Sequence, residues 1–286
     1  MCSQQIDIAT WVQSAPEGRE DFRKAVHLIL EAISLDPLLQ ESMVIKGGML
    51  LAIRYNSPRF TKDLDISTHL MPVSLTQETL IEHFDNALRR AEVVLEYGIA
   101  SRVQRCKLQP QNNPKASFPS YAITIGYAGR GTAQHKKLQR KQAPDTIPID
   151  FSFNEPTHNK ESLTLSQGSI SSYGVNDLIA EKTRSLLQQV TRERYRRQDV
   201  YDLNKLFEQS IAKIEPQTVL ESLMKKSISR GITPNRNSLD NSEVKQRAYK
   251  EYHTVADEIE GDLPDFDELY SNLIEFYKSL PWETLS

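Results

Sequence analysis

The stretch KGGMLLAIRYNSPRFTKDLDIS, residues 46–67, contains the pattern that decides the fold. The apolar run MVI just before it predicts a short buried strand that leads into a tight glycine turn. GMLLAIRYN then predicts a helix, SPRF a loop, and LDIS the start of another strand. This order of elements, continued on both sides, predicts a mixed α/β sheet domain.

The rest of the chain divides into two predicted regions. Residues 18–35 have helical spacing and stop before Pro37, because a residue that precedes proline disfavours helix. A long amphipathic helix capped by a threonine follows at 76–96, and strands are predicted at 100–108, 120–128 and 147–153. Beyond residue 173 only helical patterns remain, at 175–189, 196–209, 218–227, 242–260 and 265–280. We therefore predict an α/β (α+β) domain over residues 1–172 and a helical domain over residues 173–286.

Composition sets further bounds. Of 286 residues, 38% are apolar and 26% are charged, as in a protein with a folded core. No apolar run approaches the ~18–20 residues of a membrane span, and the polar N-terminus lacks the pattern of a secretory signal. Two cysteines, Cys2 and Cys106, cannot form a disulfide framework or a zinc site unaided. A cytoplasmic protein with no membrane partner is the simplest expectation.

The glycines and aspartates of the opening stretch suggest phosphate and metal chemistry. Gly47 and Gly48 lie at a strand-to-helix turn, where a backbone without Cβ atoms can approach an anion closely; a plain tight turn is the alternative. Asp63 and Asp65 are two residues apart on a strand and therefore point to the same side. Two neighbouring carboxylates repel unless a cation lies between them, and Mg²⁺ prefers such oxygens.

A third acid lies in the strand IPIDFSF. Ile147, Ile149 and Phe151 fall on one face of this strand and Asp150 on the other. Asp150 is either an exposed-face residue or the third member of a carboxylate cluster with Asp63 and Asp65. Three carboxylates around Mg²⁺ (or Mn²⁺) would suit in-line phosphoryl or nucleotidyl transfer.

The motifs together resemble those of AbiEii/AbiGii-type nucleotidyltransferases, a branch of the polymerase-β-like superfamily. KGGMLLAIRYNSPRFTKDLD matches the glycine turn, helix and D-x-D of that family. VNDLIAEKTRSLL is similar to its helix with a nucleotide-binding lysine after a glutamate, and RRQDVYDL to its R-x-K-D-x-x-D-L motif. The resemblance covers about residues 40–210. It implies a polymerase-β-like mixed-sheet domain followed by a helical domain.

The resemblance also implies roles for single residues. Gly47 and Gly48 would cradle the triphosphate, and Asp63 and Asp65 would hold the metal. Lys182 would contact nucleotide phosphates, and Asp199 would act as a base or support the site. The residues expected to bind the nucleotide are Lys46, Gly47, Gly48, Arg59, Lys182 and Arg196. Gln198 departs from the family pattern, which has a lysine there. Lys182 on a helix surface and Asp199 at a helix start, as ordinary structural residues, remain the alternatives.

The charge distribution bears on the acceptor. Residues 101–144 contain nine Lys and Arg and no Asp or Glu, interleaved with aromatic side chains. This mixture suits contact with RNA phosphates and bases, although a solvated basic loop explains the charge equally well. The predicted RNA-binding residues, in the stretch GRGTAQHKKLQRK, are Arg130, Lys136, Lys137, Arg140 and Lys141. Residues 240–286 carry twelve acids against four bases, which predicts a solvated face or a dock for a basic antitoxin.

The family resemblance implies a toxin of a toxin–antitoxin or abortive-infection system. We therefore expect a Mg²⁺-dependent enzyme that transfers a nucleotide from a nucleoside triphosphate to RNA, most simply the 3′ end of tRNA, and so blocks translation. Two alternatives come from other classes of protein. One is a phosphotransferase that uses the same site, and the other is an RNA-binding module without catalysis. A cognate antitoxin is the expected protein partner.

Overall fold

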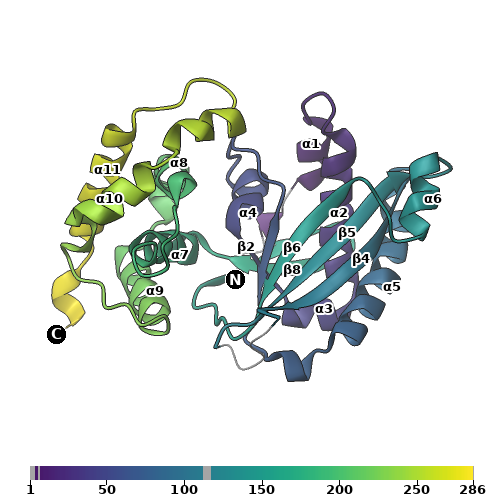
Figure 1. Cartoon of the computed structure of the whole chain (residues 1–286), viewed down its shortest axis with the longest axis horizontal. Coiled ribbons are helices and arrows are strands. Elements are labelled where there is room, and N and C mark those ends of the chain that lie inside the picture. The colour runs from purple at the N-terminus through teal and green to yellow at the C-terminus, as the bar shows by residue number, and fades with distance from the viewer. Residues whose placement is uncertain (1–3, 6, 112–116, 286) are drawn as a thin grey trace. The chain divides into compact units, whose positions relative to one another are not determined.

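The computed structural model describes residues 4–5, 7–111 and 117–285 (Figure 1). Lys115, one of the basic residues counted above, lies outside them. The chain forms two compact units: unit 1 comprises residues 1–53 and 62–172, and unit 2 comprises residues 54–61 and 173–286. The short segment 54–61 had been assigned to the first domain from sequence, whereas in the structure it groups with unit 2.

The described part of unit 1 is built on one eight-stranded mixed sheet with the order β1-β7-β8-β2-β3-β6-β5-β4. At its centre, β2 pairs antiparallel with β3, and β3 pairs parallel with β6. The strands are β1 (Gln4–Gln5), β2 (Val44–Lys46), β3 (Leu64–Ser67), β4 (Ile99–Gln109), β5 (Ser120–Gly129), β6 (Thr146–Ser152), β7 (Lys160–Thr164) and β8 (Ser169–Tyr173). The three strands with candidate site residues are therefore direct neighbours.

Helices α2 and α5 pack against β4 and supply the core that supports these strands. Apolar residues at helical spacing help to bury α2 from Ala25 to Ser34. Thr76 caps α5 by accepting a hydrogen bond from the Thr79 amide. The helices of this unit are α1 (Ile8–Gln13), α2 (Glu20–Leu35), α3 (Pro37–Ser42), α4 (Gly47–Arg54), α5 (Gln77–Leu95) and α6 (Ala133–Gln139). The α/β fold class and the long helices predicted from sequence are thus confirmed.

The predicted basic loop GRGTAQHKKLQRK is wrong in part, because its middle forms helix α6. Thr132 caps this helix through the His135 amide, and Leu138 is fully buried against Ala100 and Ala128 of the sheet. One apolar residue in a cationic stretch was too weak a periodic signal for a helix. The prediction also missed β7 and β8, whose polar serine-rich sequences are held by neighbouring strands rather than by apolar alternation.

Unit 2 is helical. Helix α8 contacts α7, α10 and α11, while α9 packs on α7. The bounds are α7 (Val175–Gln188), α8 (Arg197–Ser210), α9 (Pro216–Ile228), α10 (Ser242–Tyr249) and α11 (Phe266–Ser279). The single helix predicted over 242–260 is wrong: the chain breaks at Glu251, which has φ of 63°, and continues as the 3-10 helix Tyr252–Glu258. No helix formed by the described residues is long and apolar enough to cross a membrane.

Candidate active site

The glycine turn and the D-x-D motif meet in unit 1 through strand pairing. Lys46, the last residue of β2, lies opposite Asp65 of β3, so the turn that begins at Gly47 starts beside this aspartate. Leu64 and Ile66 are fully buried, which leaves Asp65 on the opposite face of the sheet, as the alternation predicts. The first residues of helix α4 are therefore placed next to a carboxylate.

Gly47 has no room for a side chain. Its φ is +76°, and a Cβ added there would lie 1.9 Å from Oδ2 of Asp65. Glycine is thus required at position 47 for two reasons: the backbone is left-handed there, and the carboxylate of Asp65 lies where a side chain would be. This contact is a property of the tertiary structure that the Gly-Gly dipeptide alone did not reveal.

Asp150 joins the same face. It is the parallel partner of Asp65 in the register of β3 and β6, and it is exposed between buried Ile149 and Phe151. Asp63 immediately precedes β3. Partial burial raises the pKa of Asp63, and the negative charge of Asp150 raises it further, while Lys62 acts in the opposite direction. Asp63 is therefore repelled by the carboxylate of Asp150, whereas the sequence predicted this repulsion between Asp63 and Asp65.

The chemistry of this carboxylate group fits a hard divalent cation. A cation bound between Asp63 and Asp150 would relieve the repulsion that raises the pKa of Asp63. Within the described ranges, no three Asp, Glu, His or Cys side chains come close enough to hold a metal ion together. Mg²⁺ needs only one or two protein carboxylates when substrate phosphates supply further oxygens, so the donor set suits an ion that arrives with a triphosphate.

Lys46, predicted to bind nucleotide, forms an ion pair with Glu155, an acid outside the sequence motifs. Its Nζ lies 2.6 Å from Oε2 of Glu155, and both side chains are buried. The two residues are 109 positions apart, so no local pattern links them. This ion pair fixes the end of β2 directly before the glycine turn.

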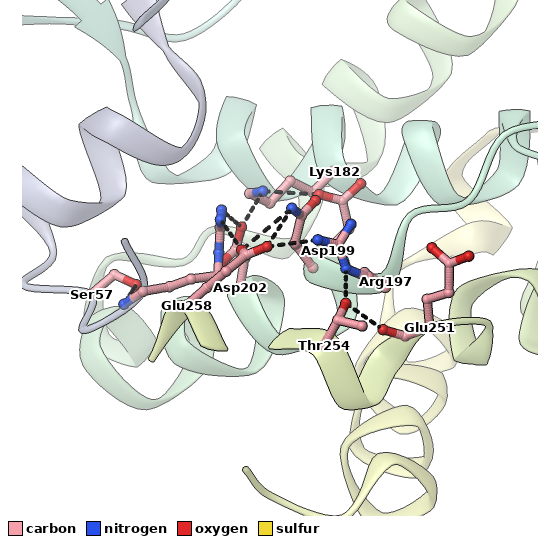
Figure 2. Close-up of polar contacts among 10 residues, drawn as sticks. Ser57, Lys182, Arg197, Asp199, Asp202, Glu251, Thr254 and Glu258 are labelled. Carbon is pink, nitrogen blue, oxygen red and sulfur yellow. Dashed lines mark hydrogen bonds and ion pairs between the residues drawn. The ribbon is translucent and has the colours of Figure 1, made fainter. Parts of the chain in front are cut away.

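In unit 2, four predicted or motif residues form one buried ion network, shown in Figure 2. Nζ of Lys182 on α7 donates to Oδ1 of Asp199 at 3.0 Å and to Oδ2 of Asp202 at 2.7 Å, both on α8. Arg59 also binds Asp202: its Nε donates to Oδ1 at 2.8 Å, and its Nη2 donates to Oδ2 at 2.7 Å. Lys182 is therefore no ordinary surface residue, and Asp199 and Asp202 are more than helix-start acids.

The network keeps its members charged. Burial alone would raise the pKa of Asp202, but Lys182 and Arg59 outweigh it and lower that pKa to about 2. Burial would likewise lower the pKa of Lys182, and the two aspartates reverse the effect and raise it. Oδ2 of Asp199 is buried and has no hydrogen-bond partner among the described residues, so one acceptor of this carboxylate stays available.

Glu258 completes the network and was not recognised from sequence. Its carboxylate pairs with Nη2 of Arg197 at 2.7 Å (Figure 2). It also pairs with Nη1 of Arg59 at 3.1 Å, and Nε2 of Gln198 lies 3.4 Å from it. Glu258 had been assigned to a solvated acidic face, and that assignment is wrong. Lys182 pairs with both Asp199 and Asp202, and Arg59 pairs with Asp202, so Arg197 pairs with Glu258 instead of these aspartates. The network thus contains three cations and three carboxylates, which balance in charge: Lys182, Arg59 and Arg197 with Asp199, Asp202 and Glu258.

The remaining candidates lie on the surface. Arg196 precedes α8, and its backbone amide donates to Oε1 of Gln189. The predicted RNA-binding residues are all exposed, at the end of β5, on α6 and just after it: Arg130, Lys136, Lys137, Arg140 and Lys141. Arg130 forms an ion pair with Glu92, whereas no ion pair is found for the other four among the described residues.

Comparison with known proteins assigns the chain to a family. The family model described as nucleotidyl transferase AbiEii toxin, type IV toxin–antitoxin system, matches residues 28–272. No curated protein matches the sequence. Among solved structures, JHP933 from Helicobacter pylori is similar at 16% identity and a TM-score of 0.51, covering 93% of both chains.

Two further structures are similar. A putative nucleotidyltransferase from H. pylori has 15% identity and a TM-score of 0.53 over 95% of this chain and 99% of its own. MenT4, a nucleotidyltransferase toxin from Mycobacterium tuberculosis, has 13% identity and a TM-score of 0.45 over 95% and 97%. The first two likenesses support the fold, and the family match covers most of the chain. This chain therefore belongs to the AbiEii family of nucleotidyltransferase toxins of type IV toxin–antitoxin systems.

Proposed function

We propose that this nucleotidyltransferase moves a nucleoside monophosphate from a Mg²⁺-bound nucleoside triphosphate to the 3′ end of tRNA, and that the modified tRNA no longer supports translation. The observation that carries the proposal is the contact between the glycine turn and Asp65, with Asp150 in register beside it. A phosphate-binding turn and two carboxylates at one place suit a metal–triphosphate.

The metal ligands are proposed to come from Asp63, Asp65 and Asp150, one or two of which would bind the ion together with phosphate oxygens of the substrate. A divalent ion held there would withdraw charge from the phosphates and activate the attacking hydroxyl. The first amides of helix α4, at Gly47 and Gly48, would bind phosphate oxygens, helped by the positive end of the helix dipole. The 3′ hydroxyl oxygen then bonds to the α-phosphorus as the bond to pyrophosphate breaks.

Lys182 is proposed to contact a nucleotide phosphate and Asp199 to act as a base, although both already take part in the buried ion network. Lys182 is already balanced by two carboxylates, so a phosphate oxygen would share its ammonium with Asp199 and Asp202. Asp199 has an acceptor oxygen without a hydrogen bond, which supports a role as a proton acceptor. The ion pairs made by Lys46 and Arg59 support positioning roles for these two residues over direct nucleotide contact.

The proposed RNA surface lies on and after helix α6. Lys136, Lys137, Arg140 and Lys141 are exposed cations, and buried Leu138 anchors the helix to the sheet. Cations fixed on a helix and not already paired are free to neutralise RNA phosphates and release counterions. Arg130 is the weakest of the five candidates because Glu92 already pairs with it.

The experiment is incubation of the purified enzyme and unfractionated tRNA with α-³²P- or γ-³²P-labelled triphosphates in Mg²⁺. We expect the α label alone to enter RNA and an Asp63→Ala variant to transfer none. Transfer of the γ label alone would show a phosphotransferase instead. Growth inhibition by Asp63→Ala as strong as that of the wild type would overturn catalysis as the toxic mechanism.

A matched pair of variants tests the RNA surface. Lys136→Gln/Lys137→Gln removes two unpaired charges of α6, whereas Arg236→Gln/Lys278→Gln removes two exposed charges that have acid partners. We expect the first pair to weaken tRNA binding and to lower its salt dependence, with little effect from the second. Equal effects of the two pairs would refute the assignment of α6.

A further inference from the structure

We propose that the loop 189–196 between α7 and α8 is a second phosphate-backbone contact for the RNA acceptor, located in unit 2 and built from Arg192, Arg194, Arg196 and Lys250. The inference rests on the proposed function, since it presupposes an RNA acceptor. Of these four residues, the sequence motifs predict a role only for Arg196, as a nucleotide contact. The loop joins the two helices that carry Lys182 and Asp199 (Figure 1).

Cations outnumber acids in this loop, where Glu193 lies among three arginines. Arg192, Arg194 and Arg196 have no ion pair among the described residues, and Arg192 and Arg194 are exposed. Partial burial lowers the pKa of Arg192, and the charges of Arg194, Arg184 and Arg196 lower it further. A surface loop gains nothing from packing like charges unless an anion binds among them.

The loop is held in shape by Gln189, which is only 1% exposed. Its carbonyl accepts from the Arg194 amide at 3.1 Å, and its side-chain Oε1 accepts from the Arg196 amide at 3.2 Å. Its Nε2 donates to the Val244 carbonyl of α10 at 2.7 Å. The buried Gln189 therefore holds the backbone of this loop in a defined conformation, which fixes the positions from which the arginine side chains extend.

Lys250 and Tyr195 extend the cationic surface. Nζ of Lys250 donates to the Tyr195 hydroxyl at 2.7 Å and lies 4.1 Å from the ring centroid, and Tyr195 is 43% exposed. The acid in this loop is Glu193, which is exposed, and nearby Arg184 is neutralised by Glu181. Glu251, which follows Lys250, is also exposed, so four cations stand against two acids and leave a positive excess.

RNA phosphate fits this surface better than a free triphosphate. The cations sit on an exposed loop and on the residue that follows α10, so they suit phosphates spaced along a strand. A compact triphosphate would need its charges to converge on one enclosed point. Arginine also donates two parallel hydrogen bonds to a phosphate, which explains why this loop carries three arginines.

The test compares full-length enzyme with Arg192→Gln/Arg194→Gln. The control is Arg236→Gln/Lys278→Gln, which removes the same charge from unit 2 but from cations paired with Glu283 and Asp240. Fluorescence anisotropy with labelled tRNA at several salt concentrations gives Kd and the salt slope. Binding of a fluorescent nucleoside triphosphate without RNA gives a separate Kd, and circular dichroism checks folding.

We expect the loop variant to bind tRNA roughly tenfold more weakly, with a salt slope smaller by about 1.5, and to bind the triphosphate as the wild type does. Arg192→Gln and Arg194→Gln as single substitutions, each expected to weaken tRNA binding by part of this factor, serve as the readout if the double variant misfolds. Unchanged tRNA affinity in the folded glutamine variant, or weaker binding of triphosphate alone, overturns the inference. Failure of wild-type enzyme to transfer the α label to RNA would instead overturn the proposed function.

Discussion

The guanidinium of Arg59 holds the carboxylate of Asp202 through two parallel hydrogen bonds of 2.8 and 2.7 Å, across 143 positions of sequence. Asp202 is fully buried, and its Oδ2 also accepts from Lys182. One carboxylate thus compensates two buried cations at once. Its removal would leave Lys182 with Asp199 and Arg59 with Glu258 as their remaining acid partners, so two buried cations would each lose a counter-charge.

Asp202→Asn tests this dependence. The substitution keeps the shape of the side chain but removes its charge, so we expect the free energy of unfolding to fall by about 3–5 kcal/mol. Urea denaturation followed by circular dichroism measures the change. Glu208→Gln is the control on the same helix, because Glu208 makes an exposed pair with Lys205 that contributes about 0.5 kcal/mol or less. Similar losses in both variants would contradict the prediction.

The same aspartate predicts an acid-dependent loss of stability. Its folded pKa is lowered to about 2 from an ordinary value of 3.8. A group with a lowered folded pKa stabilises the protein above its unfolded pKa and loses that contribution as pH falls through the folded pKa. We expect the wild type to lose stability between about pH 4 and pH 2 more steeply than Asp202→Asn. Parallel curves for the two proteins would rule this out.

Gly47→Ala, compared with an alanine at another glycine of positive φ, separates the effect of backbone strain from the effect of a steric clash with Asp65. The new Cβ would lie 1.9 Å from the Asp65 carboxylate, so we expect nucleotide transfer to fall at least about 100-fold as Asp65 is displaced. Gly98→Ala is the matched control: φ is +70° there, and nothing lies within 4 Å of an added Cβ. That variant should lose only about 1 kcal/mol of stability and keep its activity. Initial rates and denaturation curves of both variants decide between these outcomes.

Asp150→Asn should relieve repulsion while it damages function. The charge of Asp150 is one cause of the raised pKa of Asp63, so its removal should move the Asp63 pKa back toward its ordinary value. Because a raised acid pKa opposes folding at neutral pH, stability should stay equal or rise slightly. NMR titration of Asp63 and the rate of nucleotide transfer are the measurements. A large loss of stability would show that Asp150 has a structural role instead.

The same test can be made at Asp63, the other member of the repelling pair Asp63 and Asp150. Asp63→Asn removes an exposed carboxylate that is repelled by its neighbour, so the melting temperature should not fall. Nucleotide transfer should be abolished at any Mg²⁺ concentration if Asp63 is a metal ligand, as proposed. Full activity at raised Mg²⁺ would assign Asp63 a weaker role than that of ligand.

The sequence by itself determined the order of the motifs and the faces of the strands. Alternation of period two places Leu64 and Ile66 in the core and Asp65 opposite them, and that rule is local enough to be read without a structure. The same rule placed Asp150 away from Ile149 and Phe151. Capping and helical periodicity likewise predicted α2 and α5.

Only the tertiary structure decided which charges meet. Lys46 with Glu155, and Arg59 with Asp202 and Glu258, are contacts between residues more than a hundred positions apart. A sequence shows that a side chain carries charge, but its partner depends on which backbones pack together and exclude water. The close approach of Gly47 to Asp65 has the same origin, because the register of β2 and β3, rather than the glycine itself, brings the carboxylate there.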